Sequence, residues 1–237
     1  MTISNDGEAS WRPKDKWRRS QMTMKKPHPI KKLIAEGEHQ QLDFKFEISD
    51  ASKIARSLVA FANTDGGKLL IGVKDNGVIR GIRSDEEKYM LENAAQNYCQ
   101  PEVAFSTKEW EIDDKVVLEV DIPYSKKHIH KAPDKENNYK AYVRVKDQNL
   151  LANGVLMKVW IKRKKNQNIR FVYSKPVQET LFYLRENLFI TLDIAKEISG
   201  LNKYKTEHLL SDLILLEVIE LELSETNEIY RLLPSPE

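Results

Sequence analysis

Cysteine and long apolar runs are the two features that this sequence has least of. The chain of 237 residues contains a single cysteine, Cys99, so no intrachain disulfide can form. No stretch approaches the 18 consecutive apolar residues of a membrane-spanning helix, and the positively charged start lacks the apolar segment of a secretion signal. These absences predict a soluble protein of the reducing cytoplasm, without contact to a membrane.

The net charge is also small, at +2, but it is unevenly distributed. Residues 1–32 contain nine Lys or Arg against three Asp or Glu, and residues 33–165 contain 22 against 21. Residues 166–237 contain seven against 12. Charge therefore changes from basic to acidic along the chain, and the preference for partners has to be judged segment by segment.

Residues 1–28 show no sustained periodicity, which predicts a mobile basic arm. The arm contains Trp11 and Trp17, and its neighbouring cations are Arg12, Lys14, Lys16, Arg18 and Arg19. Such an arm can follow phosphates while its tryptophans stack on bases, as in proteins that bind single strands. A solvated tail explains the same composition, because basic tails are common.

Residues 29–165 alternate short helical and extended patterns, which predicts an α+β domain with a mixed sheet. We expect helices at about 30–36, 50–62, 84–98 and 150–164, and strands at 41–46, 68–73, 78–82, 103–110, 115–122 and 139–146. In the first strand, Leu42 and Phe44 share one face, so the polar residues between them are expected on an opposite, accessible face. Residues 63–67, Asn-Thr-Asp-Gly-Gly, are predicted to form a turn that ends the helix. Alternatively, this turn presents backbone N–H groups to a phosphate.

Residues 170–234 have a different, mainly helical pattern. Pro176 lies near the start of one predicted helix, and Thr191 can cap a second. A third helix is expected over 202–216, followed by a hairpin of 218–223 with 228–233. Three helices followed by a hairpin are typical of a small winged-helix domain. This unit is acidic overall, which argues against strong affinity for duplex DNA.

Three blocks of the first domain form a distinctive combination. They are Glu38-x4-Asp43-Phe44-Lys45, then Ala-Phe-Ala-Asn-Thr-Asp-Gly-Gly at 60–67, then Leu-Ile-Gly-Val-Lys-Asp-Asn-Gly at 70–77. Together these blocks resemble the Schlafen AlbA_2 family. The likeness covers roughly residues 30–155. Where the family usually has Glu, this chain has the shorter Asp43. Members have often been described as divergent ATPases, yet no G-x-x-x-x-G-K-[ST] phosphate-binding loop occurs here.

The resemblance implies an α/β domain that contacts DNA or RNA, often in paired copies. Some animal Schlafens cut structured RNA through three metal-dependent carboxylates, which would map to Glu38, Asp43 and Asp75 as catalytic and metal-binding residues. Such a cluster suits Mg²⁺ or Mn²⁺, and Lys45, on the same strand face as Asp43, could hold the phosphate. Alternatively, the first two are surface acids and Asp75 is only the turn residue of Asp-Asn-Gly.

Further cations are candidates for contacts to nucleic acid. They are Lys45, Arg80, Lys126, Lys127, Lys131, Arg144, Lys146, Lys203 and Lys205. Ordinary solvated surface is the alternative for each. His128 and His130 alternate on a polar loop, which is weak evidence for a metal pair because no cysteine is near.

Three functions fit these observations. The first is a nucleic-acid-binding, regulatory protein with no cofactor, and the second is an RNA endonuclease that uses Mg²⁺ or Mn²⁺. The third is a protein-interaction adaptor that binds through the acidic winged helix. Because the family's domains work in pairs and this chain has one copy, a homodimer is expected.

Overall fold

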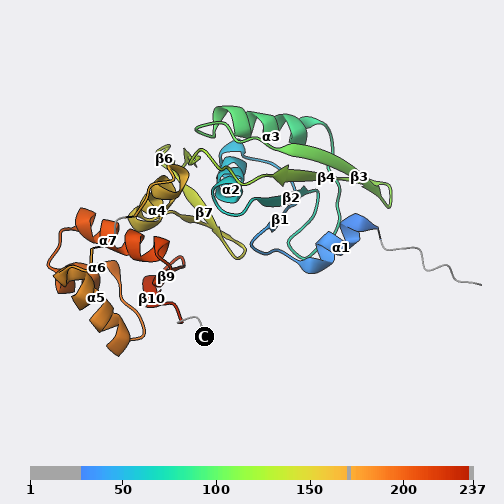
Figure 1. The fold of residues 1–237 in the computed structure, drawn as a ribbon. Coiled ribbons are helices and arrows are strands. Elements are labelled where there is room, and N and C mark those ends of the chain that lie inside the picture. Colours follow the sequence, from blue (N-terminus) through green and yellow to red (C-terminus); the bar gives the residue numbers. More distant parts are fainter. Residues whose placement is uncertain (1–27, 170–171, 235–237) are drawn as a thin grey trace, which may run out of the picture.

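The computed structural model describes residues 28–169 and 172–234, so the predicted arm at 1–28 lies almost wholly outside the described residues. Two units follow each other along the chain, a larger one built on a sheet and a smaller one built on helices (Figure 1). The helices are α1 (Pro29–Glu36), α2 (Ala51–Asn63), α3 (Glu86–Asn97), α4 (Gly154–Lys164), α5 (Lys175–Glu186), α6 (Leu192–Ser199) and α7 (Lys203–Leu215). The strands are β1 (Leu42–Lys45), β2 (Gly67–Ile71), β3 (Ser106–Ile112), β4 (Lys115–Ile122), β5 (Ala132–Pro133), β6 (Tyr139–Lys140), β7 (Tyr142–Val145), β8 (Gln148–Leu151), β9 (Ile219–Leu223) and β10 (Glu228–Leu232).

The larger unit is organised around a four-stranded sheet in the order β1-β2-β4-β3. Strands β1 and β2 are parallel, and the other two pairings are antiparallel. The sheet is therefore mixed, as predicted, and β1 forms one of its edges. Two short hairpins, β5–β6 and β7–β8, follow the sheet in the chain.

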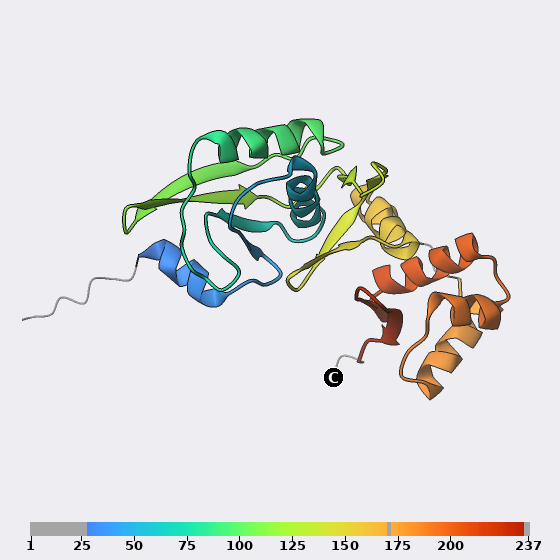
Figure 2. The ribbon, with the colours of Figure 1, turned by 180° about the vertical axis from the view of Figure 1, so that it is seen from behind.

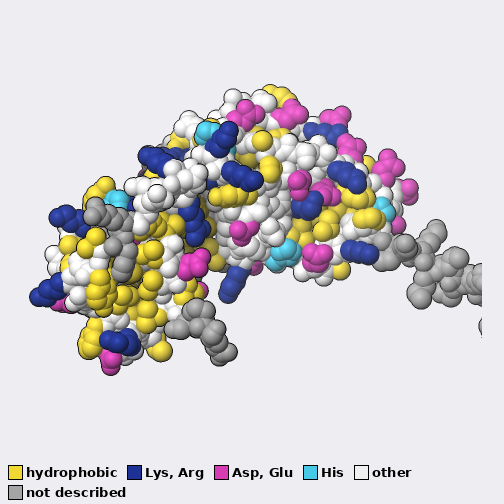
Figure 3. All heavy atoms as spheres, viewed as in Figure 1, with side chains coloured by type: hydrophobic (Ala, Val, Ile, Leu, Met, Phe, Trp, Pro, Cys, Tyr) yellow, Lys and Arg dark blue, Asp and Glu magenta, His cyan; other side chains and the backbone are white. Residues whose placement is uncertain are grey.

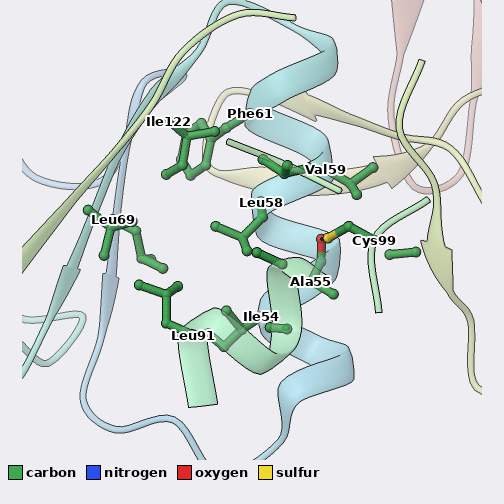
Figure 4. Close-up of a cluster of buried hydrophobic side chains, with 14 of the residues drawn as sticks. Ile54, Ala55, Leu58, Val59, Phe61, Leu69, Leu91, Cys99 and Ile122 are labelled. Atoms are coloured by element: carbon green, nitrogen blue, oxygen red, sulfur yellow. The ribbon is translucent and has the colours of Figure 1, made fainter. Parts of the chain in front are cut away.

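Helices cover both faces of this sheet (Figure 2). On one face, α2 and α3 bury a cluster that contains Leu58 of α2, Leu91 of α3 and Leu69 of β2 (Figure 4). On the other face, Leu42 and Phe44 of β1 belong to a second buried cluster next to α1. The expectation of an accessible polar face on β1 is wrong, because the second face of the strand is buried as well.

Helix α2 begins and ends where its sequence signals indicate. The Asp50 side chain accepts a hydrogen bond from the Ser52 backbone N–H at 2.9 Å, which caps the helix. At the other end Gly66 has φ +68°, and a Cβ there would lie 2.7 Å from the Ile122 carbonyl oxygen. The Asn63 side chain bonds the backbone of His130 in both directions, through its amide nitrogen and its oxygen. These contacts account for the 63–67 turn structurally.

Two predicted elements differ from the structure. The expected strand 78–82 contributes a single bridge, Val73 to Ile79, because Gly77 and Gly81 both have positive φ angles. The helix expected from residue 150 begins at Gly154, since Leu150 instead pairs with Val143 in the β7–β8 hairpin. Asn153 then caps α4 by accepting from the Leu156 N–H at 2.7 Å.

The smaller unit contains α5, α6 and α7 followed by the β9–β10 hairpin, the element order expected of a winged helix. Ile190, between α5 and α6, bridges to Tyr230 of β10. Val155 of α4 is part of the buried cluster of this unit, so α4 joins the two units physically. The predicted domain boundary near residue 165 stays a prediction. None of the helices in 28–169 and 172–234 has the length and apolarity needed to cross a membrane.

Candidate nucleic-acid interface

Asp43, the central residue of the predicted carboxylate cluster, is buried and paired with two cations. Only 2% of its surface is exposed. One carboxylate oxygen lies 3.3 Å from a guanidinium nitrogen of Arg144, and the other lies 2.9 Å from Nζ of Lys45. The charge of Asp43 is therefore neutralised within the fold.

Arg144 was predicted to contact nucleic acid, and that prediction is wrong for the structure described. The residue comes from β7, is 2% exposed and is the largest fully buried side chain. Besides Asp43, its guanidinium donates to the Asn149 side chain at 3.1 Å and lies 5.0 Å from the centre of the Phe61 ring. Arg144 thus connects β7 to β1 and α2 and presents no charge at the surface.

The cluster around Asp43 also closes the free edge of β1. Alternate residues of an edge strand direct their backbone groups away from the sheet, where those groups need other partners. Arg144 donates to the Leu42 carbonyl at 3.2 Å, and Lys45 Nζ donates to the Phe44 carbonyl at 2.8 Å. The Phe44 N–H donates to the Glu38 carboxylate at 2.8 Å. Four predicted site residues therefore have a structural role at this edge: Glu38, Asp43, Lys45 and Arg144.

Glu38 has an unusual protonation equilibrium because of its place beside Asp43. Burial raises the pKa of Glu38 to about 7, and a hydrogen bond to Asp43 acts in the same direction. The Phe44 N–H, which favours the ionised form, opposes both effects. Near neutral pH Glu38 is therefore protonated for a large part of the time.

Asp75, the third predicted carboxylate, is exposed in the turn after β2. Among the residues that the structure describes, no group of three His, Cys, Asp or Glu side chains is arranged to hold a metal ion. Mg²⁺ and Mn²⁺ require several converging oxygen ligands, whereas two cationic side chains already occupy the oxygens of Asp43. The residues present do not fit the predicted metal site.

A second group of cations is exposed where the loop 123–131 meets the end of α4. Lys164 at that end donates to the Ser125 carbonyl and lies 4.7 Å from the centre of the Tyr124 ring. Burial at this contact lowers the pKa of Lys164. The exposed cations that flank the contact, here called the basic junction, are Lys126, Lys127, Lys131, Arg163 and Lys165. Within the described residues none of the five forms an ion pair.

The distribution of charge over the surface agrees with this arrangement. Lys and Arg side chains gather around α4 and the short hairpins, whereas Asp and Glu dominate the end formed by α3 and the β3–β4 hairpin (Figure 3). Sequence reasoning found the three lysines of the loop but missed Arg163 and Lys165. Their signal was the absence of acids: residues 122–133 and 148–178 contain no Asp or Glu, and the second segment includes Lys-Arg-Lys-Lys at 162–165.

The other exposed cations that were predicted to contact nucleic acid are not part of the basic junction. Arg80 is exposed near the end of β2, whereas the loop 123–131 adjoins the start of that strand, where Gly67 pairs with Ile122. Lys146 is exposed in the β7–β8 turn, and Lys203 and Lys205 are exposed at the start of α7. The structure therefore does not bring all the predicted cations onto one surface.

His128 and His130 do not form a metal pair. His130 is buried, and its Nδ1 lies 2.8 Å from the Pro101 carbonyl oxygen. Burial lowers the pKa of His130 and favours the neutral ring. His128 is exposed, and the two ring centres lie 6.3 Å apart at 77°.

Helix α7, the expected recognition helix, is packed against α4. Lys158 forms a 2.5 Å ion pair with Glu207, and Lys162 forms a 2.7 Å ion pair with Asp212. Lys158 also lies 4.8 Å from the centre of the Tyr204 ring. Glu207, Asp212 and Tyr204 therefore line the side of α7 that faces α4. That side is occupied within the chain.

Two solved structures have some similarity to this chain. DIP2311 from Corynebacterium diphtheriae is similar, with 17% identity and a TM-score of 0.44, over 77% of this chain and 36% of that chain. This chain thus corresponds to little more than a third of the length of DIP2311. The N-terminal domain of a DNA helicase RecG-related protein from Nitrosomonas europaea is 23% identical, with a TM-score of 0.34, over 47% of this chain and 80% of that chain.

The family comparison covers most of the larger unit. Residues 38–153 match the model of the family described as Schlafen, AlbA_2. The match includes the three sequence blocks at 38–45, 60–67 and 70–77, and it ends just before α4 begins. Residues 38–153 are therefore similar to the Schlafen AlbA_2 family, in the part of the chain where the motifs predicted it.

Proposed function

We propose that this protein binds nucleic acid and that the basic junction supplies the phosphate contacts. One observation carries the proposal: two segments that contain no Asp or Glu meet at Lys164. Five exposed cations beside this contact therefore have no carboxylate partner in the described residues. Unpaired Lys and Arg side chains bind phosphates and release condensed counterions, which is the main source of affinity for nucleic acids. The match of residues 38–153 to the AlbA_2 family supports the same class of partner.

Tyr124 adds a second kind of contact to the proposal. Its exposed ring lies beside Lys164, at the centre of the basic junction. Aromatic rings next to a cationic surface stack on unpaired bases, and stacking tolerates different sequences. We therefore propose that the partner is single-stranded or structured nucleic acid, bound with little sequence preference.

Charge reversal at the basic junction tests the proposal. Binding of short fluorescent DNA and RNA strands, single and duplex, is measured by anisotropy over a range of salt concentrations. We expect the double variants Lys126→Glu/Lys127→Glu and Arg163→Glu/Lys165→Glu each to weaken binding about tenfold or more. Each should also reduce the slope of log K against log salt by about 1 to 2.

The control is Lys32→Glu, an exposed lysine of α1 in the acidic end of the molecule. It changes the net charge by the same amount per residue, so any effect shared with it is a general electrostatic effect. Equal salt slopes for the wild type and both double variants would contradict the proposed interface.

We further propose that the role is regulatory binding without strand cleavage. Support comes from the β1 edge, where Asp43 is already neutralised by Arg144 and Lys45. Incubation of the purified protein with tRNA and Mn²⁺ is expected to leave the RNA intact. Cleavage that is lost in Asp75→Ala would contradict this part of the proposal and favour an endonuclease.

The protein is also proposed to act as a homodimer. One AlbA_2 domain is present in the chain, and a second copy would provide a second basic junction. Two linked sites bind one polynucleotide more tightly than either site alone, because the second contact is intramolecular. Light scattering that returns the mass of one chain at all concentrations would contradict the homodimer.

A further inference from the structure

The smaller unit exposes an apolar groove with an acidic rim on the outer side of α5. The groove is lined by Gln178, Glu179, Phe182, Tyr183, Glu186, Asn187 and Ile198, and is here called the α5 groove. Phe182 in this groove is 59% exposed, and the guanidinium of Arg185 lies 5.6 Å from the centre of its ring. Hydrophobic side chains gather over this unit more densely than over the rest of the same view (Figure 3). Exposed apolar patches on a folded chain commonly mark interaction surfaces.

The rim of the α5 groove indicates the charge of its occupant. Glu179 and Glu186 lie three residues before and four residues after Phe182, so all three share one side of the helix. Glu186 has no ion-pair partner among the described residues, and Glu179 has only Lys175 at 3.7 Å, an exposed pair of little energetic weight. An occupant that buries Phe182 and neutralises these acids needs large apolar side chains with Lys or Arg beside them.

The chain itself contains a segment of that composition. Residues 11–19 read Trp-Arg-Pro-Lys-Asp-Lys-Trp-Arg-Arg, with two tryptophans and five cations against the single acid Asp15. This segment lies outside the described residues. We propose that residues 11–19 of one copy occupy the α5 groove of a second copy, with tryptophan against Phe182 and arginine against the acidic rim. The inference deepens the proposed homodimer and does not depend on nucleic-acid binding.

The arrangement of the units favours a second copy over the same chain. Helix α1, where the described chain begins, and the winged-helix unit lie at opposite ends of the molecule in both views (Figures 1 and 2). Ten residues separate Trp17 from His28, and they span at most about 35 Å when fully extended. Reciprocal exchange between two copies fills both grooves, and each contact raises the effective concentration of the other.

Association of the full chain tests the groove. Sedimentation equilibrium is measured for wild type, Phe182→Ala and Trp11→Ala/Trp17→Ala, and we expect the dimer dissociation constant to rise about tenfold or more in both variants. The control is Tyr89→Ala, which removes an equally exposed aromatic ring from α3. Unchanged dissociation constants in both variants would overturn the proposal, as would an effect of the same size in the control.

Charge exchange and cross-linking establish which segment occupies the groove. Glu179→Lys/Glu186→Lys is expected to weaken the dimer about tenfold, and addition of Arg18→Glu/Arg19→Glu to the same chain is expected to restore it. A bismaleimide should also link an Asp15→Cys chain to a Gln178→Cys chain when the two are mixed, since the native Cys99 is buried. Failure of either the rescue or the mixed cross-link would overturn exchange between copies.

The same variants separate this proposal from the nucleic-acid proposal. The groove variants are expected to keep the salt slope of wild type for a strand short enough to fill one site, because the basic junction is unchanged. Loss of nucleic-acid binding in the tryptophan variant without any change in dimer mass would overturn the inference and assign residues 11–19 to nucleic acid instead.

Discussion

Arg144 and Lys127 are both basic residues of the larger unit, and the sequence makes them equal candidates for a phosphate contact. The structure places them in opposite environments. Arg144 is buried between β7 and β1 with Asp43 as its partner, whereas Lys127 is exposed in a loop without any acid. The first charge is used to hold strands together, and only the second is available to a partner.

The difference between the β1 edge and the basic junction is therefore one of neutralisation. At the β1 edge every cation is matched to an acid or to a backbone carbonyl, which an edge strand requires when it is covered. At the basic junction, five cations remain unmatched within the described residues. The number of cations in a segment predicts binding less well than the number that lack a partner.

Removal of Arg144 is expected to give the largest effect on stability. Arg144→Met fills similar volume but leaves the Asp43 carboxylate buried with Lys45 as its remaining cation, and the Leu42 carbonyl loses a donor. Loss of one partner of a buried ion pair costs about 3–5 kcal/mol, so we expect a fall of that size in the free energy of unfolding. Urea denaturation monitored by circular dichroism measures it.

The comparison for Arg144→Met is Lys146→Ala, two residues further along the chain. Lys146 is exposed in the β7–β8 turn, and its side chain forms no ion pair in the described part of the chain. A surface change of this kind is expected to alter stability by less than about 0.5 kcal/mol. Similar losses in both variants would remove the distinction between structural and available cations.

Helix α4 contains the same contrast within a single turn. Lys162 is buried and donates to Asp212 at 2.7 Å and to the Ser211 hydroxyl at 2.8 Å, whereas its neighbour Arg163 is exposed. Lys162→Met leaves two α7 acceptors without their donor, and we expect a loss of about 1–3 kcal/mol in the unfolding of the smaller unit. Thermal unfolding followed by tryptophan fluorescence measures it, since Trp160 lies in α4.

Lys196→Met provides the matched control for Lys162→Met. Lys196 forms an exposed ion pair with Asp193 at 3.1 Å, and such pairs contribute about 0–1 kcal/mol. A larger loss in the control than in Lys162→Met would mean that the contact between α4 and α7 does not hold the two units together.

The fold was predictable from the sequence where local signals agree with one another. Alternating apolar residues predicted β1, and the helical pattern at 50–62 predicted α2. Strand β8 was missed because Leu150 and Leu151 also suit the start of a helix, and only pairing with β7 decides between the two. Local signals therefore predicted the main elements of the larger unit, whereas contacts distant in sequence determined its short strands.

The site was less predictable, because the partner of a charged residue is chosen by tertiary contacts. Asp43 and Arg144 are 101 residues apart in the chain, and no local pattern indicates that they meet. The alternation of apolar and polar residues in β1 predicted a polar face on that strand. It could not predict that β7 and α2 cover this face, because β7 is distant from β1 in the sequence. The acid-free segments, in contrast, were visible in the sequence and contained the exposed cations.

Protonation of Glu38 gives the smallest and most specific prediction at the β1 edge. Its pKa is about 7 in the fold against an ordinary value of 4.5, so the folded state binds the proton more tightly than the unfolded state does. Stability is therefore expected to fall as pH rises from about 4.5 to 7 and to change little from this group above that. Glu38→Gln keeps an oxygen acceptor for the Phe44 N–H but has no proton to lose, so this part of the pH dependence should vanish.

Urea denaturation of wild type and Glu38→Gln at pH 5 and pH 8 measures the difference. The wild type is expected to lose more stability between the two pH values than the variant, and the exposed control Glu92→Gln is expected to follow the wild type. An equal pH dependence in all three would mean that Glu38 is ionised throughout. In that case the two carboxylates would balance the charges of Arg144 and Lys45, and the β1 edge would carry no net charge.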